Sequence, residues 1–335
     1  MNFHFITPVW GEAYIDLYLN IVLPTQLSPG NLLAFRNEPG AIYKIHTTTE
    51  GAEAIVSSSV YLVLSQVMEI QIKVFNYSKE IYESCKYKLM NYCHQHAVIE
   101  ANQTDSVLII LTADAIFSDG AFSTLKQKAY EGKQALMIMG ISVVKETFVP
   151  LFVEQYISQQ EPTVKVSCQE LVKLSLEHIH PVMKRFFWDS PEYHGCAANV
   201  YWSVKDQGFI ARCFHLHPLM IKPMIKTVLP LNTIDFYYLE KACPSIDDIY
   251  VVEDSDEIVV FEISSLHEKD WHYNSDGLTI EKIVGWAKDN TTFLHREFSK
   301  HKIRMHSQYI HQKDWENVEK ETDEIFRQVY QLLDS

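Results

Sequence analysis

The sequence predicts an α/β protein with a mostly parallel central sheet flanked by helices. Short apolar runs of the length of a buried strand alternate along the chain with longer stretches of helical spacing, as in consecutive βαβ units. No loop of the GxGxxG or GxxxxGK[ST] type follows any of these runs, which disfavours a classical dinucleotide fold and a P-loop enzyme.

The expected elements follow from apolar spacing and from turn residues. In the first half of the chain we expect strands at residues 3–9, 41–47, 107–111 and 135–141, and helices at 13–23, 60–69, 79–100 and 121–132. The first of these helices should stop at Pro24. In the second half we expect a helix at 166–178, a strand-like run at 208–223, strands at 249–253 and 258–263, and helices from 278 to the end.

Composition narrows the class of protein. The chain has 29 Lys and Arg against 43 Asp and Glu, a formal net charge of −14, which disfavours a nucleic-acid partner. Its 6 cysteines stand singly, so neither a disulfide framework nor a zinc ribbon is predicted. The first residues lack the basic region of a signal peptide, and the most apolar run, 135–144, is too short to span a bilayer. We therefore expect a cytoplasmic protein without a transmembrane segment.

Acidic and hydroxyl side chains gather directly after the apolar run at 107–111: Thr112, Asp114, Ser118 and Asp119. In open α/β sheets, ligands bind at the carboxyl ends of the strands. A carboxylate there can hold a divalent cation, and the cation can hold a diphosphate. The alternative is that Asp114 or Ser118 caps the helix that begins near Ala121. This stretch alone leaves both interpretations open.

Two histidines, the single acid Asp235 and one acidic run are further candidates. His215 and His217 are two residues apart on an expected strand, so both should point to one face and can ligate a metal or contact phosphates. The commoner alternative is a pair of half-buried structural histidines. Asp235 can act as a general base or as a helix cap. The acidic run at 253–257 lacks the spacing of an EF-hand, and we expect a solvated hairpin loop for most of its charges.

Several motifs together resemble one family. The opening FITPVWGEAYIDLYLNIVLPTQLSPGNL, the run LIILTADAIFSDG and the later FHLHPLMIKP, with TID and DSDE, occur in this order. They resemble a group of bacterial glycosyltransferase-like proteins with the nucleotide-diphospho-sugar transferase (GT-A-like) fold, over most of the chain. What the resemblance implies about function rests on analogy with GT-A glycosyltransferases, which share this fold.

The resemblance implies a donor site and a metal site. It places a nucleotide pocket at the end of the first strand and at the end of the second, with these contacts: Thr7, Pro8, Val9, Trp10, His46, Thr47 and Thr48. It implies Mn²⁺ or Mg²⁺ at a DXD-type motif that Asp114 would represent, with a histidine contact from His215 or His217. The sequence departs from that motif because no acid stands two residues after Asp114, and the next one is Asp119.

The implied function is transfer of a sugar from a nucleoside diphosphate sugar to a hydroxyl group of a carbohydrate or other acceptor, assisted by a metal. Asp235 is the first candidate for the base, ahead of Asp254 and Asp256. The expected domain is residues 1–265, with a nucleotide-binding half at 1–145 and an acceptor and metal half at 146–265. A helical segment at 266–335 should pack on the same domain. The alternatives are a metal-dependent phosphoester hydrolase and an inactive nucleotide- or sugar-binding protein.

Overall fold

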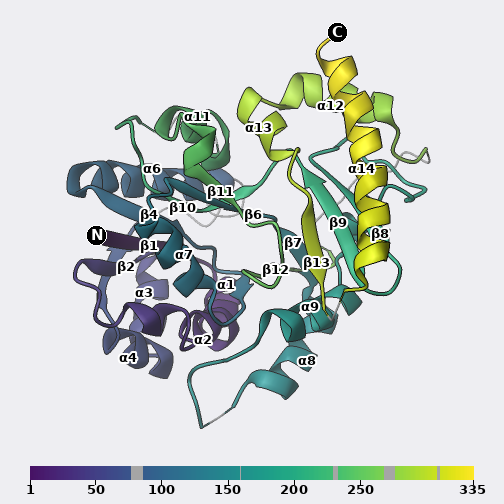
Figure 1. Ribbon diagram of the computed structural model, residues 1–335. Coiled ribbons are helices and arrows are strands. Elements are labelled where there is room, and N and C mark those ends of the chain that lie inside the picture. Colours follow the sequence, from purple (N-terminus) through teal and green to yellow (C-terminus); the bar gives the residue numbers. More distant parts are fainter. Residues whose placement is uncertain (77–85, 159, 229–232, 268–275, 308–309) are drawn as a thin grey trace. The chain divides into compact units, whose positions relative to one another are not determined.

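The computed structural model describes residues 1–76, 86–158, 160–228, 233–267, 276–307 and 310–335 (Figure 1). The chain forms two compact units. Unit 1 consists of Met1–Ile138, Val153–Val166 and His217–Tyr250, and unit 2 of Met139–Phe152, Ser167–Leu216 and Val251–Ser335. The domain boundaries expected from the sequence stay a prediction.

Unit 1 is built on a seven-stranded sheet with the order β11-β6-β10-β4-β1-β2-β3. Its strands are β1 (Asn2–Pro8), β2 (Ala41–Thr47), β3 (Glu69–Val74), β4 (Ser106–Ile110), β6 (Ala135–Ile138), β10 (His217–Ile221) and β11 (Ile249–Val251). Strand β1 is parallel to β2 and β4, and β2 is parallel to β3. Strand β10 runs antiparallel to both β4 and β6. The predicted α/β class with a mostly parallel sheet is therefore confirmed.

The central strands are apolar because both of their faces are covered. Phe3 and Phe5 of β1 are fully buried, and four of the five residues of β4 are buried. On one face Tyr43 of β2 donates a hydrogen bond to Gln26, which lies in the segment after β1. On the other face Lys44 forms an ion pair with Glu100 of the helix α6 (Lys86–Thr104). Neighbouring residues of one strand thus reach opposite layers of the unit.

The remaining elements of unit 1 are short, apart from α6. They are α1 (Glu12–Leu17), a π-helical turn η1 (Tyr18–Val22), α2 (Leu23–Gln26), η2 (Leu32–Phe35), α3 (Thr49–Val56), α4 (Ser59–Ser65), β5 (Ala115–Phe117), α7 (Ala121–Tyr130), η3 (Ile234–Tyr238), α11 (Leu239–Ala242) and η4 (Ile246–Asp248). Residues of α8 (Lys145–Tyr156) belong to both units.

Two expectations for unit 1 are corrected. Pro24 does not stop the first helical segment: α1, η1 and α2 follow one another without a break, and the backbone stays helical through Val22 and Leu23, with the π-helical turn η1 directly before the proline. Glu69 does not end a helix but begins β3, a half-exposed strand that the apolar pattern did not indicate. The expected helix at 79–100 corresponds to α6, and its first part lies outside the described residues.

Unit 2 contains a three-stranded antiparallel sheet with the order β13-β9-β8. Its strands are β8 (Asn199–Val204), β9 (Gly208–Cys213) and β13 (Ile303–His306), and β7 (Ile141–Val144) pairs in parallel with β12 (Val260–Ser264). Its helices are α9 (Cys168–Glu177), α10 (Pro181–Lys184), α12 (Ile280–Asn290), α13 (Phe293–Phe298) and α14 (Gln312–Leu333). A buried core joins Val200 and Trp202 of β8 to Ile283 of α12 and Phe326 of α14.

Three sequence expectations differ from the structure here. The strand expected at 135–141 is two strands, β6 and β7, separated at Met139 and Gly140. The run at 208–223 is also two strands, β9 and β10. Residues 303–306, expected to be helical, form β13 because they pair with β9. Among the described residues, no helix is both long enough and apolar enough to cross a membrane.

Candidate functional site

The sheet of unit 1 has a position where its strand order reverses. The chain proceeds from β1 outward to β2 and β3, and then returns to place β4 on the other side of β1. In open α/β sheets, ligands bind outside the carboxyl ends of the strands at such a switch point. The segment that leaves β1 carries Trp10, and the segment that leaves β4 carries Asp114. We call the residues at and directly after the carboxyl ends of β1, β2, β3 and β4 the carboxyl edge.

The carboxyl edge carries a pair of partly exposed aromatic rings. Trp10 follows β1 and Phe75 follows β3; their ring centroids are 5.8 Å apart and the planes meet at 74°. The backbone N–H of Phe75 donates to Thr47 O at 2.9 Å, which keeps this residue beside the end of β2. Rings of this kind provide apolar surface on which a planar base can stack.

Several buried polar atoms at the same edge lack protein partners. His46 Nε2, Thr47 Oγ1, Thr112 Oγ1 and both ring nitrogens of His94 are buried and form no hydrogen bond within the part of the chain that the structure describes. His94 lies on α6, while the other three lie at or beyond the ends of β2 and β4. Buried polar groups almost always find a partner, so these atoms mark a place for water or a ligand.

The two histidines of this group are uncharged at neutral pH. Burial, reinforced by Lys73 and by neighbouring histidines, lowers the pKa of His46 to about 3. Burial lowers the pKa of His94 to about 4, although the nearby carboxylate of Asp235 acts in the opposite direction. A neutral imidazole offers one donor and one acceptor. The edge can therefore recognise an uncharged polar group such as a base or ribose.

The other predicted nucleotide contacts are mostly tied into the fold. Thr7 is fully buried, and its hydroxyl hydrogen-bonds with Tyr43 OH at 2.8 Å. Pro8 and Val9 are buried as well, and the Thr48 hydroxyl caps α3 by accepting from Gly51 N at 3.1 Å. Trp10, His46 and Thr47 are therefore the predicted contacts whose side chains have the exposure or the free polar atom that ligand binding requires.

The predicted metal ligands have separate roles. Asp114 lies in the turn between β4 and β5 and is partly buried. Asp119 Oδ1 accepts a hydrogen bond of 2.6 Å from Gly30 N, and its other oxygen lies 3.9 Å from Lys165. The residue before α7 is Gly120, with no side-chain cap, so the alternative in which Asp114 or Ser118 caps this helix is wrong.

His215 and His217 do not share a strand, which corrects the expectation that they point to one face. His217 is the exposed first residue of β10, whereas His215 lies between β9 and β10. In unit 2 the His215 Nε2 donates to Asn290 O at 3.0 Å, and its ring lies 4.4 Å from that of His295. Among the described residues, no group of three metal-ligating side chains includes either histidine, Asp114 or Asp119.

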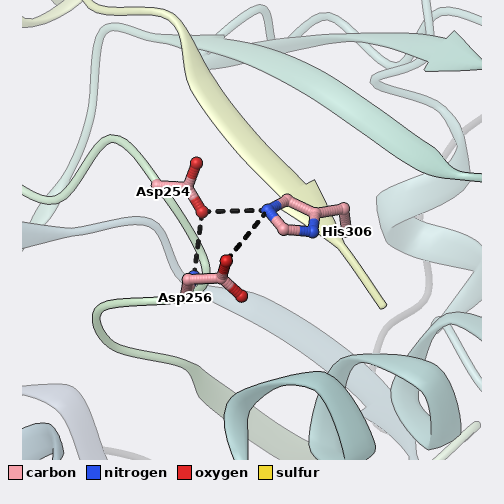
Figure 2. Close-up of side chains that lie close together, drawn as sticks. All are labelled: Asp254, Asp256 and His306. Carbon is pink, nitrogen blue, oxygen red and sulfur yellow. Dashed lines mark hydrogen bonds and ion pairs between the residues drawn. The ribbon is translucent and has the colours of Figure 1, made fainter. Parts of the chain in front are cut away.

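A different group in unit 2 can hold a metal ion: Asp254, Asp256 and His306. One ligand atom from each lies within 4.8 Å of the other two (Figure 2). His306 Nε2 is 2.9 Å from Asp254 Oδ1 and 3.9 Å from Asp256 Oδ2. Two carboxylates and an imidazole form a donor set that Mn²⁺ and Zn²⁺ accept. We refer to these three residues as the Asp–Asp–His group.

The backbone fixes the positions of its members. The segment at 253–255 runs along β13, with hydrogen bonds from Arg304 N to Glu253 O and from Ser255 N to Arg304 O. The Ser255 hydroxyl accepts from His306 N at 3.1 Å, and the His306 ring packs edge-on against Trp315 of α14. These contacts align the imidazole with the two carboxylates before any ion binds.

This segment is not the expected hairpin loop, although Glu253 and Asp256 are exposed and only Asp254 and Glu257 are partly buried. The strands on either side, β11 and β12, belong to different sheets. Burial alone would raise the pKa of Asp254, but hydrogen bonds from the His306 side chain and the Asp256 backbone lower it below its usual value. Asp254 therefore stays ionised at neutral pH. The sequence did contain the Asp-x-Asp spacing, but His306 fell in a stretch expected to be helical.

The chain matches known proteins in structure only. No family model and no curated protein matches the chain. Among solved structures, it resembles a putative glucose-1-phosphate thymidylyltransferase from Bacillus anthracis (14% identity, 44% of this chain and 58% of that one, TM-score 0.26). It also resembles S. aureus TarS (10% identity, 86% and 38%, TM-score 0.32) and mouse xyloside xylosyltransferase 1 (13% identity, 46% and 59%, TM-score 0.26).

This chain spans between 38% and 59% of the length of those three structures. At these TM-scores the likeness carries no argument about activity. The function proposed below therefore rests on the residues of the carboxyl edge and of the Asp–Asp–His group.

Proposed function

We propose that the protein transfers a sugar from a nucleoside diphosphate sugar to an acceptor hydroxyl, with the donor bound at the carboxyl edge of unit 1. The observation that carries this proposal is the set of buried polar atoms without protein partners at the switch point of the sheet. Two of the motifs that resemble nucleotide-diphospho-sugar transferases, the opening and the run LIILTADAIFSDG, contain the segments that leave β1 and β4.

In this proposal the nucleoside occupies the side of β1 and β2. The base stacks on Trp10 and Phe75, and the neutral imidazoles of His46 and His94 exchange hydrogen bonds with uncharged polar groups of the nucleoside. Asp114 follows β4, across β1 from these residues, where a divalent cation on the diphosphate would meet a carboxylate. A Mg²⁺ or Mn²⁺ ion in such a site takes one or two carboxylates and completes its shell with phosphate oxygens and water.

Asp235 would accept the proton of the acceptor hydroxyl. It lies in η3, close enough to His94 to act on the pKa of that histidine. In the reaction, the bond between the sugar anomeric carbon and the diphosphate oxygen breaks, and the nucleoside diphosphate leaves with the electron pair. A new bond joins the anomeric carbon to the acceptor oxygen, and the proton of that oxygen passes to Asp235.

Turnover of nucleoside diphosphate sugars tests this proposal. Release of free nucleoside diphosphate, dependent on one base, is expected from the purified protein with a panel of sugar nucleotides and acceptors. Asp235→Asn should lower the rate by about 10²-fold or more while nucleoside diphosphate affinity stays the same. Glu240→Gln, which changes a neighbouring acid on α11, is the matched control and should leave the rate unchanged.

The same assay separates the alternatives. Hydrolysis of simple phosphoesters without any nucleotide requirement would favour the hydrolase, and base-specific binding without turnover would favour a binding protein. If no nucleotide binds and no sugar nucleotide turns over, the transferase proposal fails.

We also propose that the Asp–Asp–His group binds a divalent cation, Mn²⁺ or Zn²⁺. The nearly buried imidazole of His306 and the ionised carboxylate of Asp254 support it, because they are held in position without an ion. Addition of the metal alone should raise the unfolding temperature of the wild type, and Asp254→Asn with Asp256→Asn should abolish that shift. Glu253→Gln, which removes a neighbouring carboxylate, should leave the shift intact.

A further inference from the structure

One face of unit 1 differs from the rest of the chain in its charge. Across residues 86–104 and 217–228 the only carboxylate is that of Glu100, whereas the whole chain carries 43 acidic residues and a net charge of −14. Glu100 does not add negative charge to this face, because it is partly buried and forms ion pairs with Lys44 and Lys73. What remains on the outer side of these two segments is basic, aromatic, aliphatic or neutral polar.

The exposed side of α6 carries large apolar groups beside lysines. Tyr87 is 65% exposed, Tyr92 42% and Ile99 43%, and Lys86 and Lys88 are exposed in the first turn. Residues 88, 92, 96, 99 and 103 recur at helical spacing and form one continuous strip, which includes Lys88, Tyr92 and Ile99, whereas Lys86 and Tyr87 are exposed beside it at the N-terminal end of the helix. The opposite side of α6 is buried on the sheet.

The segment after β10 extends this strip. Met224 is 57% exposed, Ile225 52% and Val228 70%, with the exposed Lys226 between them. Asn102 of α6 donates a hydrogen bond of 3.1 Å to Thr227 O, which holds the segment beside the last turns of the helix. From residue 87 to residue 102, α6 extends about 22 Å. We call the exposed members of both segments the basic apolar face: Lys86, Tyr87, Lys88, Tyr92, Ile99, Met224, Ile225, Lys226 and Val228.

We propose that the basic apolar face docks the protein on an anionic lipid membrane. Lysines attract the face to anionic headgroups, tyrosines suit the polar–apolar boundary, and the aliphatic side chains enter the upper acyl region. The remainder of this acidic chain is repelled by such a surface, so the basic apolar face, whose members include three lysines and no carboxylate, is the one that approaches. The docking is peripheral, and it does not depend on the proposed transfer reaction.

Vesicle co-sedimentation of the whole chain tests this proposal. At about 0.1 M salt, binding to vesicles of 30 mol% phosphatidylglycerol in phosphatidylcholine should exceed binding to pure phosphatidylcholine by about 10-fold or more. The difference should shrink at about 0.5 M salt, because the lysine contacts are screened.

Two surface variants identify the face. Lys86→Glu with Lys88→Glu should weaken vesicle binding by about 10-fold or more. Lys313→Glu with Lys320→Glu makes the same change of charge on the exposed side of α14 and should weaken it far less. Ile225→Ser with Val228→Ser should also weaken binding, while Leu62→Ser, an exposed apolar side chain on α4, should not. Circular dichroism of each variant confirms that it folds.

The proposal is wrong if the wild type stays in the supernatant with anionic vesicles, or if it binds both vesicle types equally. It is also wrong if the α14 variant loses as much binding as the α6 variant, since net charge would then account for the effect.

Discussion

The backbone N–H of Gly30 donates a 2.6 Å hydrogen bond to Asp119 Oδ1, joining residues that are 89 positions apart in the chain. The contact is tight: a Cβ on Gly30 would lie 2.5 Å from Gly120 N and 2.8 Å from that carboxylate oxygen. Asp119 thus holds the turn before η2 against the start of α7. The Asp119 carboxylate, although it follows the central strand, therefore has a structural role.

The first prediction follows from this contact. Gly30→Ala should lower the free energy of unfolding by about 2–4 kcal/mol, because the new methyl group meets backbone that cannot move aside. Gly285→Ala is the control: this glycine lies inside α12 with open space around its Cβ position, and the change should stabilise the protein by about 0.5–1 kcal/mol. Urea unfolding measures both, and equal effects of the two variants would contradict the prediction.

The second prediction concerns acid stability and the buried His94. Its folded pKa of about 4 lies below the ordinary value of 6.5, so the unfolded chain takes up a proton that the folded chain refuses. Above pH 6.5 both states leave His94 neutral, so this difference in proton uptake does not affect stability there. The free energy of unfolding then falls as the pH drops from about 6.5 toward 4, by at most about 1.4 kcal/mol per pH unit. His94→Leu should reduce this slope. His311→Leu, which removes an exposed imidazole, should keep the wild-type slope; the same slope in all three proteins would show that burial does not act on His94 as described.

The third prediction concerns Asp254. Its lowered pKa means that its hydrogen bond with His306 stabilises the fold above the unfolded pKa of about 3.8, and that this stabilisation is lost as the pH falls through the folded pKa. Asp254→Asn should cost about 1 kcal/mol at pH 7, since the carboxylate is partly exposed and solvent weakens the pair. The cost should shrink as the pH falls below 3.8 and through the folded pKa, where the wild-type carboxylate takes up its proton.

Asp256→Asn is the comparison for Asp254→Asn. Its carboxylate is 55% exposed and 3.9 Å from His306, so the change should cost less than about 0.5 kcal/mol. Chemical denaturation in metal-free buffer checks both variants. A larger loss for Asp256→Asn than for Asp254→Asn would contradict the geometry of the Asp–Asp–His group.

The fourth prediction concerns the aromatic pair at the carboxyl edge. Trp10→Ala should weaken nucleoside diphosphate binding by about 10-fold or more, the usual effect of losing one base-stacking ring. Trp188→Ala, which removes an indole from unit 2, should leave the affinity unchanged. Fluorescence titration with a labelled nucleotide measures the affinity. Unaltered binding by Trp10→Ala would show that the base does not stack on Trp10.

The sequence predicted the elements whose apolar pattern is continuous. The run at 107–111 and the strand at 41–47 were found because both faces of the sheet are covered and burial leaves a continuous signal. Strand β3 was missed because its residues are half-exposed at the end of the sheet, and β13 because its pairing with β9 is decided by residues about 95 positions away.

The candidate site was predictable only where it follows a strand. The positions of Trp10, Thr47 and Asp114 could be expected, since the carboxyl ends of parallel strands share one edge. The roles of His94 and His306 could not. Their environments are made by α6 packing on the sheet and by the segment at 253–255 lying along β13, and no local pattern encodes either contact.

The central claim is that a nucleoside diphosphate binds at the carboxyl edge of unit 1. Calorimetric titration of the protein with UDP, GDP, CDP and ADP, each with and without Mn²⁺, tests it directly, repeated on Asp114→Ala and on the exposed control Asp206→Ala. We expect one base to bind, more tightly with Mn²⁺, and the metal-dependent part to disappear in Asp114→Ala alone. Failure of all four nucleotides to bind would contradict the account.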